Sequence, residues 1–176
     1  MLEFKNKILK SFNYSNKIYD NKFKSYHWEY QNRKKKDLLK IENLENFRNN
    51  KLSEGLDDQF YSEKETKQLF QSLLKENDED FIIKMLENRN IGNSNISFKY
   101  KNKNYSTNEL FHIKYMAKIQ KYIKTNKDSI ICEIGPGYGS FISKFLKIFN
   151  NKIILIDLPE ANFINSFFLK KIFPEK

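Results

Sequence analysis

Apolar residues recur at intervals of three or four through the first two thirds of the chain, and this pattern changes near residue 128. Before that point the intervals predict helices. One such run is Leu38, Ile41, Leu44 and Phe47. After that point, two short apolar runs flank a segment rich in glycine, and apolar runs of that length are typical of buried strands. The pattern therefore predicts a mixed α/β chain whose last quarter differs from the rest.

Two helices are predicted after a linker in the middle of the chain. The linker is "SEGLDD", residues 53–58, which interrupts the helical pattern. Ser62 and Glu65 have the spacing of a capping box, so we expect a helix to begin there. A second short helix is expected from about Phe81, and Gly92 is expected to end it with a left-handed C-cap.

A hairpin and a longer helix are predicted next. Apolar and polar residues alternate over 96–100, and "KNKN", residues 101–104, has the composition of a turn. Ser106 or Thr107 can cap the following helix, which we expect to extend to about Lys124. The apolar face of that helix is predicted to be Leu110, Ile113, Met116, Ala117 and Ile123.

From residue 128 the chain has the order of a βαβ unit. The apolar run 130–134 predicts a strand, the glycines of 135–139 a turn, and residues 141–149 a helix. A second apolar strand is predicted over 152–157, and a helical pattern resumes after it. This order implies a parallel strand pair with a right-handed crossover.

Composition indicates the class of protein and its compartment. The 176 residues are 39% hydrophobic and 15% aromatic, which is enough to form a core. No apolar run approaches the roughly 18–20 residues that span a membrane, and the N-terminus lacks the apolar region of a signal peptide. Cys132 is the single cysteine, and we expect it to be buried in the first strand. These features predict a cytoplasmic protein with no transmembrane segment.

The formal net charge of +10 comes mostly from the first forty residues, which contain 11 basic and 4 acidic side chains. The basic residues are densest at "RKKK", residues 33–36. However, 29 of the 32 basic residues are lysines, whereas proteins that read nucleic acids favour the planar guanidinium of arginine. We therefore expect a solvated basic face and no nucleic-acid partner. A patch for an acidic polymer or a membrane surface is the alternative.

Three of the five glycines, Gly135, Gly137 and Gly139, lie within five residues. Glycines allow the backbone to approach a ligand and to take positive φ, and ligands of parallel sheets bind outside the carboxyl ends of the strands. Asp157 ends the next predicted strand, where its carboxylate can accept hydrogen bonds from both hydroxyls of a ribose. The arrangement predicts a site for an adenosine-containing cofactor. The alternatives are a tight turn for the glycines and a helix N-cap for Asp157.

The spacing of the glycines indicates which cofactor. A dinucleotide site has the pattern G-x-G-x-x-G, whereas "GPGYG" has G-x-G-x-G, and no Gly-Lys-Ser/Thr of a P-loop follows. Glu133 precedes Gly135 by two residues, where a carboxylate would repel a pyrophosphate but suits a cationic ligand. The residues favour a positively charged nucleoside without phosphates, a description that fits S-adenosylmethionine.

"CEIGPGYG", residues 132–139, and "IDLPE", residues 156–160, resemble the first two motifs of class I S-adenosylmethionine-dependent methyltransferases. The chain is most similar to a family of bacterial sugar O-methyltransferases, which also have a helical N-terminal extension. The resemblance implies a Rossmann-like fold and places the cofactor's methionine part among the glycines, its ribose on the aspartate and its adenine along the next leucine. The residues so implied are Glu133, Gly135, Pro136, Gly137, Tyr138, Gly139, Asp157 and Leu158.

We therefore predict an α/β chain of three parts. They are a basic helical N-terminal region (1–52), a helical segment with a small hairpin (53–127) and a partial Rossmann-like domain that binds S-adenosylmethionine (128–176). The family's catalytic domain has about seven strands and the sequence reaches only the second, so we expect a truncated domain whose apolar strands self-associate or require a completing partner.

Two functions remain open from the sequence. The first is an O-methyltransferase acting on a sugar hydroxyl, with the sugar implied by the resemblance alone. The second is a non-catalytic remnant or interaction module that docks through its basic N-terminus. The catalytic base is not identified, because His27 and His112 both lack a motif around them.

Overall fold

The computed structural model describes residues 2–18, 25, 26, 29, 30, 41–49, 62–86, 91–94, 97–126 and 128–175. It confirms a mixed α/β chain with two small sheets of two strands each. The elements are α1 (Leu2–Ile18), the 3₁₀ helix η3 (Ile41–Asn46), α3 (Glu63–Glu76), α4 (Glu79–Met85), β1 (Ser97–Tyr100), β2 (Lys103–Ser106), α5 (Thr107–Tyr122), β3 (Ile130–Ile134), α6 (Ser140–Ile148), β4 (Lys152–Ile156) and α7 (Pro159–Ile172).

The predicted order of strand, helix and parallel strand is confirmed in the last quarter of the chain. β3 and β4 pair in parallel, with Ile130 opposite Lys152 and Ile134 opposite Ile156, and α6 connects them. The second strand ends one residue earlier than predicted, so Asp157 follows it instead of belonging to it. Because the strands are parallel, their carboxyl ends meet at one edge of the sheet.

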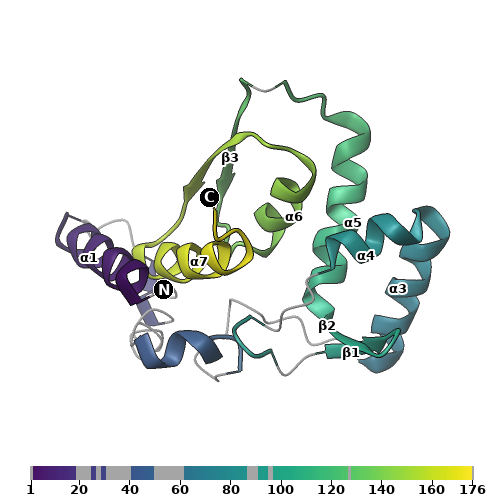
Figure 1. Cartoon of the computed structure of the whole chain (residues 1–176), viewed down its shortest axis with the longest axis horizontal. Helices are drawn as coiled ribbons and strands as arrows, with labels where there is room; N and C mark the ends of the chain where they lie inside the picture. The colour runs from purple at the N-terminus through teal and green to yellow at the C-terminus, as the bar shows by residue number, and fades with distance from the viewer. Residues whose placement is uncertain are drawn as a thin grey trace.

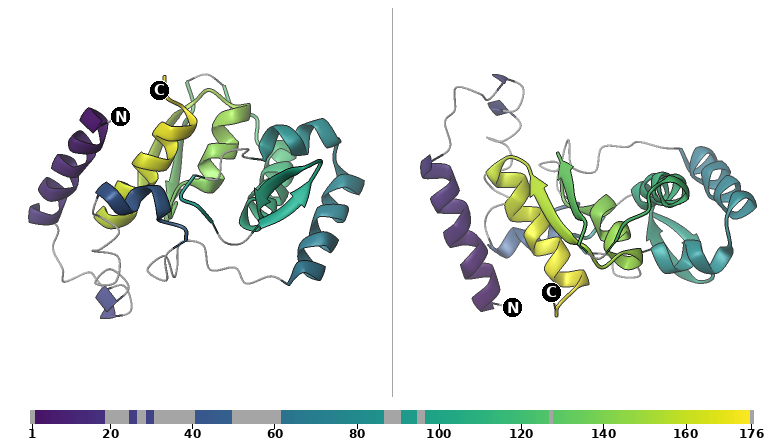
Figure 2. Two further views of the ribbon diagram at one scale, coloured as in Figure 1. Left: turned by 60° about the horizontal axis from the view of Figure 1, so that its bottom comes forward. Right: turned by 90° about the horizontal axis from the view of Figure 1, so that it is seen from above.

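The other helices and the hairpin lie at the two ends of this unit. Figure 1 shows α1 beside α7 at one end of the molecule and α3, α4 and the β1–β2 hairpin at the other, with α5 next to α6 between them. The two views of Figure 2 show the same order. Among the described helices, none combines the length and the apolarity that a membrane span requires.

The first apolar cluster joins the N-terminal helix to the C-terminal one. Its buried residues are Ile8, Phe12, Leu44, Phe47, Ile91, Tyr138, Phe163, Ile164, Phe167 and Phe168. Leu44 lies in the 3₁₀ helix η3 and Phe47 follows directly after its end, and three residues per turn match the three-residue apolar spacing seen in the sequence. Glu45 accepts from Lys5 of α1 and from Lys171 of α7, at 3.2 and 3.1 Å. Elements far apart in the sequence therefore share one core.

The second cluster contains α3, α4, α5 and the hairpin. The predicted capping box is confirmed, because the Ser62 hydroxyl accepts from the Glu65 amide and the Glu65 carboxylate accepts from the Ser62 amide. The hairpin is also confirmed, but its turn is only Lys101 and Asn102, which take positive φ, whereas residues 103 and 104 of the predicted turn belong to β2. This combination of positive φ at both central residues is typical of tight hairpins.

The two faces of the β3–β4 sheet have different surroundings. Ile131, Ile153 and Leu155 pack against Met116 of α5, Ile142 and Phe145 of α6, and Leu169 of α7. The opposite face is exposed and consists of Ile130, Cys132, Ile134, Ile154 and Ile156. The expectation that Cys132 is buried is therefore wrong, because side chains alternate along a strand and position 132 lies on the exposed face.

Three further details differ from prediction. α4 ends at Met85 with an extended Leu86, so Gly92 is not its C-cap. Gly92 does take positive φ, in a turn against Phe47, where a Cβ would lie 2.5 Å from the ring. α5 ends two residues before Lys124, which leaves Ile123 exposed outside its apolar face.

The predictions made for Leu38, residues 33–36 and residues 53–58 fall outside the described residues, and the division at residues 52 and 127 stays a prediction.

Candidate functional site

All eight site residues predicted from the sequence lie at the carboxyl edge of the β3–β4 sheet. The glycine loop, residues 135–139, connects β3 to α6. Its three glycines all take positive φ, which is the conformation that side chains disfavour. A Cβ added at Gly135 or Gly137 would meet nothing within 4 Å, whereas one at Gly139 would lie 3.4 Å from Asn165 and Leu169 of α7. Two of the glycines therefore face open space and the third packs against the protein.

Backbone hydrogen bonds hold the loop in this shape. The Gly135 amide donates to the carbonyl of Ile156 at 2.8 Å, which continues the pairing of β3 with β4. The Gly139 amide donates to the carbonyl of Pro136 at 2.9 Å, and Pro136 itself is buried. Gly139 is also the N-cap residue of α6, in the left-handed conformation. The loop is therefore an ordered turn that leads into a helix, with bare backbone on its outer side.

Asp157 connects the glycine loop to the end of β4. Its Oδ2 accepts from the amide of Gly137 at 3.0 Å, and its Oδ1 accepts from the amide of Leu158 at 2.7 Å. The N-cap of α7 is Leu158, which excludes the alternative that Asp157 caps that helix. Because a carboxylate oxygen can accept more than one hydrogen bond, Asp157 can shape the loop and also accept a ligand hydroxyl.

Glu133 is half-buried on the covered face of the sheet, opposite Leu155. Its Oε2 is inaccessible to water and has no hydrogen-bond partner. Burial, and secondly the nearby charge of Asp157, raise the pKa of Glu133 to about 7. A buried carboxylate oxygen without a partner is costly when ionised, and a cation beside it would remove that cost.

Tyr138 anchors the inner side of the glycine loop. Its buried ring contacts Phe168 edge-on at 4.9 Å and Phe47 at 5.7 Å between centroids, and the guanidinium of Arg48 lies 4.9 Å from its centroid. Arg48 also donates to the carbonyl of Ile91 and to the hydroxyl of Ser106. The N-terminal segment thus contacts the loop directly.

Sequence reasoning missed Arg48. Its only signal in the sequence is rarity, since 29 of the 32 basic residues are lysines. Its neighbours come from positions 91, 106 and 138, and no local pattern announces contacts over such separations. An arginine suits this place because the planar guanidinium stacks on an aromatic ring while its N–H groups donate sideways.

A second set of polar side chains lies beneath the loop, between α5 and α6. Lys144 and Glu109 form a fully buried ion pair at 2.8 Å. His112 Nδ1 lies 2.8 Å from the hydroxyl of Ser140, the first residue of α6. These contacts fix α6 against α5 and with it the exit of the glycine loop. His27 lies outside the described residues, so the structure does not place it.

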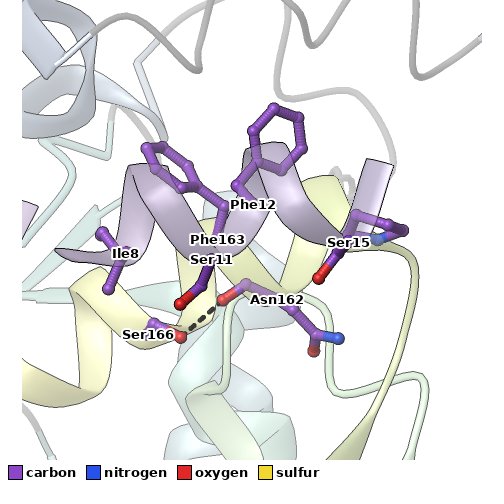
Figure 3. Close-up of a pocket in the computed structure, with 8 residues that line it drawn as sticks. Ile8, Ser11, Phe12, Ser15, Asn162, Phe163 and Ser166 are labelled. Atoms are coloured by element: carbon purple, nitrogen blue, oxygen red, sulfur yellow. Dashed lines mark hydrogen bonds between the residues drawn. The ribbon is translucent and has the colours of Figure 1, made fainter. Parts of the chain in front are cut away.

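A pocket between α1 and α7 has no part in this site. Figure 3 shows it, with Ser11 and Ser15 on one side and Asn162 and Ser166 on the other. The Ser166 hydroxyl donates to the carbonyl of Asn162. The pocket has a volume of about 130 Å³. Ligand pockets commonly have about 300–1,000 Å³, and none of the glycine-loop residues lines this one. We interpret it as a packing gap between two helices.

Within the described residues, no group of three or more His, Cys, Asp and Glu side chains is arranged to hold a metal ion. No protein-family profile, curated protein or solved structure matched the chain.

Proposed function

We propose that the glycine loop binds S-adenosylmethionine and that the chain is the cofactor-binding part of an O-methyltransferase. The observation that carries the proposal is the pairing of bare backbone at Gly135 and Gly137 with the partnerless buried oxygen of Glu133. The first is suited to a ligand that approaches closely, and the second to a ligand that is positively charged. In the same proposal, the β3–α6–β4–α7 segment begins a Rossmann-like domain.

The residues present fit this cofactor better than a phosphate-bearing one. A pyrophosphate at the loop would face the carboxylates of Glu133 and Asp157 with no lysine or arginine among the predicted site residues. A nucleoside with a cationic amino-acid end places positive charge there instead. Burial and the charge of Asp157 raise the pKa of Glu133 to about 7, and a cation beside it would favour its charged form.

Each residue then has a definite task. Gly135 and Gly137 allow close approach, because a side chain at either position would project into the open space beside the loop. Asp157 holds the loop through the Gly137 amide and, since a carboxylate oxygen accepts more than one hydrogen bond, can also accept from ribose hydroxyls, while Leu158 offers an apolar edge to the adenine. Glu133 receives the cationic end. When bound, the cofactor supplies an electrophilic methyl group.

The identity of the methyl acceptor rests on the resemblance alone, which points to a sugar hydroxyl. Of the two histidines, the described one, His112, is bonded to Ser140 beneath the loop, and we assign it no catalytic role. We propose a cytoplasmic location, which the single exposed Cys132 suits because thiols stay reduced there.

An interaction module is the second candidate, favoured by one observation. Ile130, Ile134, Ile154 and Ile156 expose an apolar sheet face, and exposed apolar faces often mark contacts with another polypeptide. The two candidates are compatible if the chain is one part of an assembled enzyme.

Calorimetric titration with S-adenosylhomocysteine tests the proposal, with NADH as the comparison ligand. We expect S-adenosylhomocysteine to bind and NADH not to bind. Asp157→Ala should weaken that binding by roughly 1–3 kcal/mol, because ribose hydroxyls would lose their acceptor. Preferential binding of NADH, with no effect of Asp157→Ala, would contradict the methyltransferase proposal.

A further inference from the structure

Glu133 occupies an unusual position for an acidic residue. It lies in a strand, on the face that packs against helices, between an apolar residue of its own strand, Ile131, and the glycine loop. Across the strand pair it is opposite Leu155. Its Oε2 is buried and has no hydrogen-bond partner. Burial and the nearby charge of Asp157 both disfavour a negative charge there.

The charged and titratable groups on the surrounding elements do not supply a counter-charge. Asp157, beyond the end of β4, faces Glu133 and adds repulsion. On α5 and α6, Glu109 and Lys144 are paired with each other at 2.8 Å, and His112 contacts Ser140. On α7, the first-turn acidic residue Glu160 is buried. Without a cationic ligand, burial and Asp157 raise the pKa of Glu133 to about 7, so the uncharged acid is well populated near neutral pH.

We propose that binding of a cationic ligand at the glycine loop is coupled to release of a proton from Glu133, so that the site holds such a ligand more tightly as the pH rises. This rests on the proposed function, because it assumes that the ligand's positive end lies beside Glu133. The O–H bond of the carboxylic acid breaks, the proton passes to solvent, and the resulting carboxylate pairs with the cation. No oxidant, reductant or further reactant is needed.

The size of the effect follows from linkage. With a pKa near 7 in the free protein, about half of the Glu133 side chains carry a proton at pH 7. If only the ionised form binds the cation, about half a proton is released per ligand at pH 7, and affinity rises about tenfold between pH 6 and pH 8. The same equilibrium acts in reverse at low pH, where proton uptake by Glu133 weakens binding of the cation.

The experiment is calorimetry of the full chain with S-adenosylhomocysteine, whose ammonium is the cationic group, at pH 6, 7 and 8. Each titration is repeated in two buffers with different ionisation enthalpies, because the difference in heat counts the protons released. Adenosine is the matched ligand control, since it has the nucleoside but no cationic end. Glu133→Gln is the matched variant, with nearly the same shape and no titrating group.

Proton release and a rise in affinity with pH are expected for S-adenosylhomocysteine, and neither for adenosine. Both effects should vanish in Glu133→Gln, whose folding is checked by circular dichroism. Should that variant fail to fold, the proton count of the natural chain with the two ligands still decides. Binding without proton exchange, or equal exchange with adenosine, would overturn the coupling and leave the proposed function intact. If neither ligand binds, the proposed function fails, and the coupling fails with it.

Discussion

The two sides of the glycine loop are built in opposite ways. On the inner side, Tyr138 is 3% exposed and contacts Phe47, Arg48 and Phe168, and Gly139 packs against α7. On the outer side, Gly135 and Gly137 have nothing within 4 Å of where a side chain would begin. The loop's shape is therefore set from one side only, and this leaves its backbone accessible from the other.

This contrast favours the proposed binding loop over a simple tight turn. A turn needs glycine only for its positive φ, and such a turn has no need of an aromatic anchor with an arginine stacked on it. Here the anchor recruits residues from the N-terminal segment, and the hydrogen bond from Gly137 to Asp157 adds a second fixed point. If the loop binds a ligand as proposed, this ordering would reduce the entropy lost on binding.

The largest effect is expected from removing the anchor. Tyr138→Ala leaves a cavity among Phe47, Arg48 and Phe168, so the free energy of unfolding should fall by about 3 kcal/mol or more. Chemical denaturation measures it. Tyr138→Phe keeps the ring and is the control, for which we expect less than half of that loss. An equally small loss for both variants would mean that the inner side does not hold the loop.

A side chain on the outer side should affect binding more than folding. Gly137→Asn tolerates the positive φ of 56° better than other residues would, yet places a polar group in the open space. We expect affinity for S-adenosylhomocysteine to fall more than about tenfold, or 1.4 kcal/mol, with a smaller change in stability. Calorimetry and thermal unfolding measure the two quantities. Normal binding by Gly137→Asn would identify the loop as a turn only.

Glu133 links the loop to the stability of the whole fold. Its folded pKa of about 7 lies above the ordinary 4.5, so between these values the folded chain holds more protons than the unfolded chain. The contribution of Glu133 to unfolding free energy therefore declines as the pH rises from about 4.5 to about 7.

Glu133→Gln removes this dependence. We expect the variant to gain about 1 kcal/mol over the natural chain at pH 8 relative to pH 5, a figure reduced because the group is only half-buried and water screens it. Denaturation at the two pH values measures the gain. A constant difference between the proteins at both pH values would show that Glu133 has an ordinary pKa.

The local features of the fold could be predicted from the sequence, because each depends on residues close together in the chain. The capping box at Ser62 and Glu65, the hairpin turn at Lys101 and Asn102, and the strand Ile130–Ile134 all depend on local spacing. The eight site residues were brought to one edge for the same reason, since a parallel strand pair joined by one helix places both carboxyl ends together.

The contacts that hold the loop could not be predicted, because they join distant residues. Nothing near Arg48 points to Tyr138, and nothing near Gly92 points to Phe47, whose ring excludes a side chain there. The prediction that Cys132 is buried failed for a related reason. An apolar run predicts a strand covered on both faces, but whether a helix lies over each face depends on the rest of the packing.

The smallest effect on stability is expected at the exposed face of β3 and β4, where the same contrast between covered and bare recurs. Ile134 is 79% exposed and lies opposite Ile156, which is also exposed, whereas Ile153 packs in the covered cluster. Ile134→Thr keeps the β-branched shape and should change the free energy of unfolding by less than about 0.5 kcal/mol. Ile153→Thr, the matched control, should cost about 1–3 kcal/mol because its hydroxyl enters an apolar contact.

A second measurement tests whether this apolar face is exposed in solution. A hydrophobic dye should bind the natural chain and bind less to a variant with both Ile134→Thr and Ile156→Thr, because the apolar patch shrinks while the fold is kept. Dye fluorescence and light scattering, compared at equal concentration, measure this. A loss of stability in Ile134→Thr as large as in Ile153→Thr would show that position 134 is covered in solution, as it would be if another copy or a partner packed on this face.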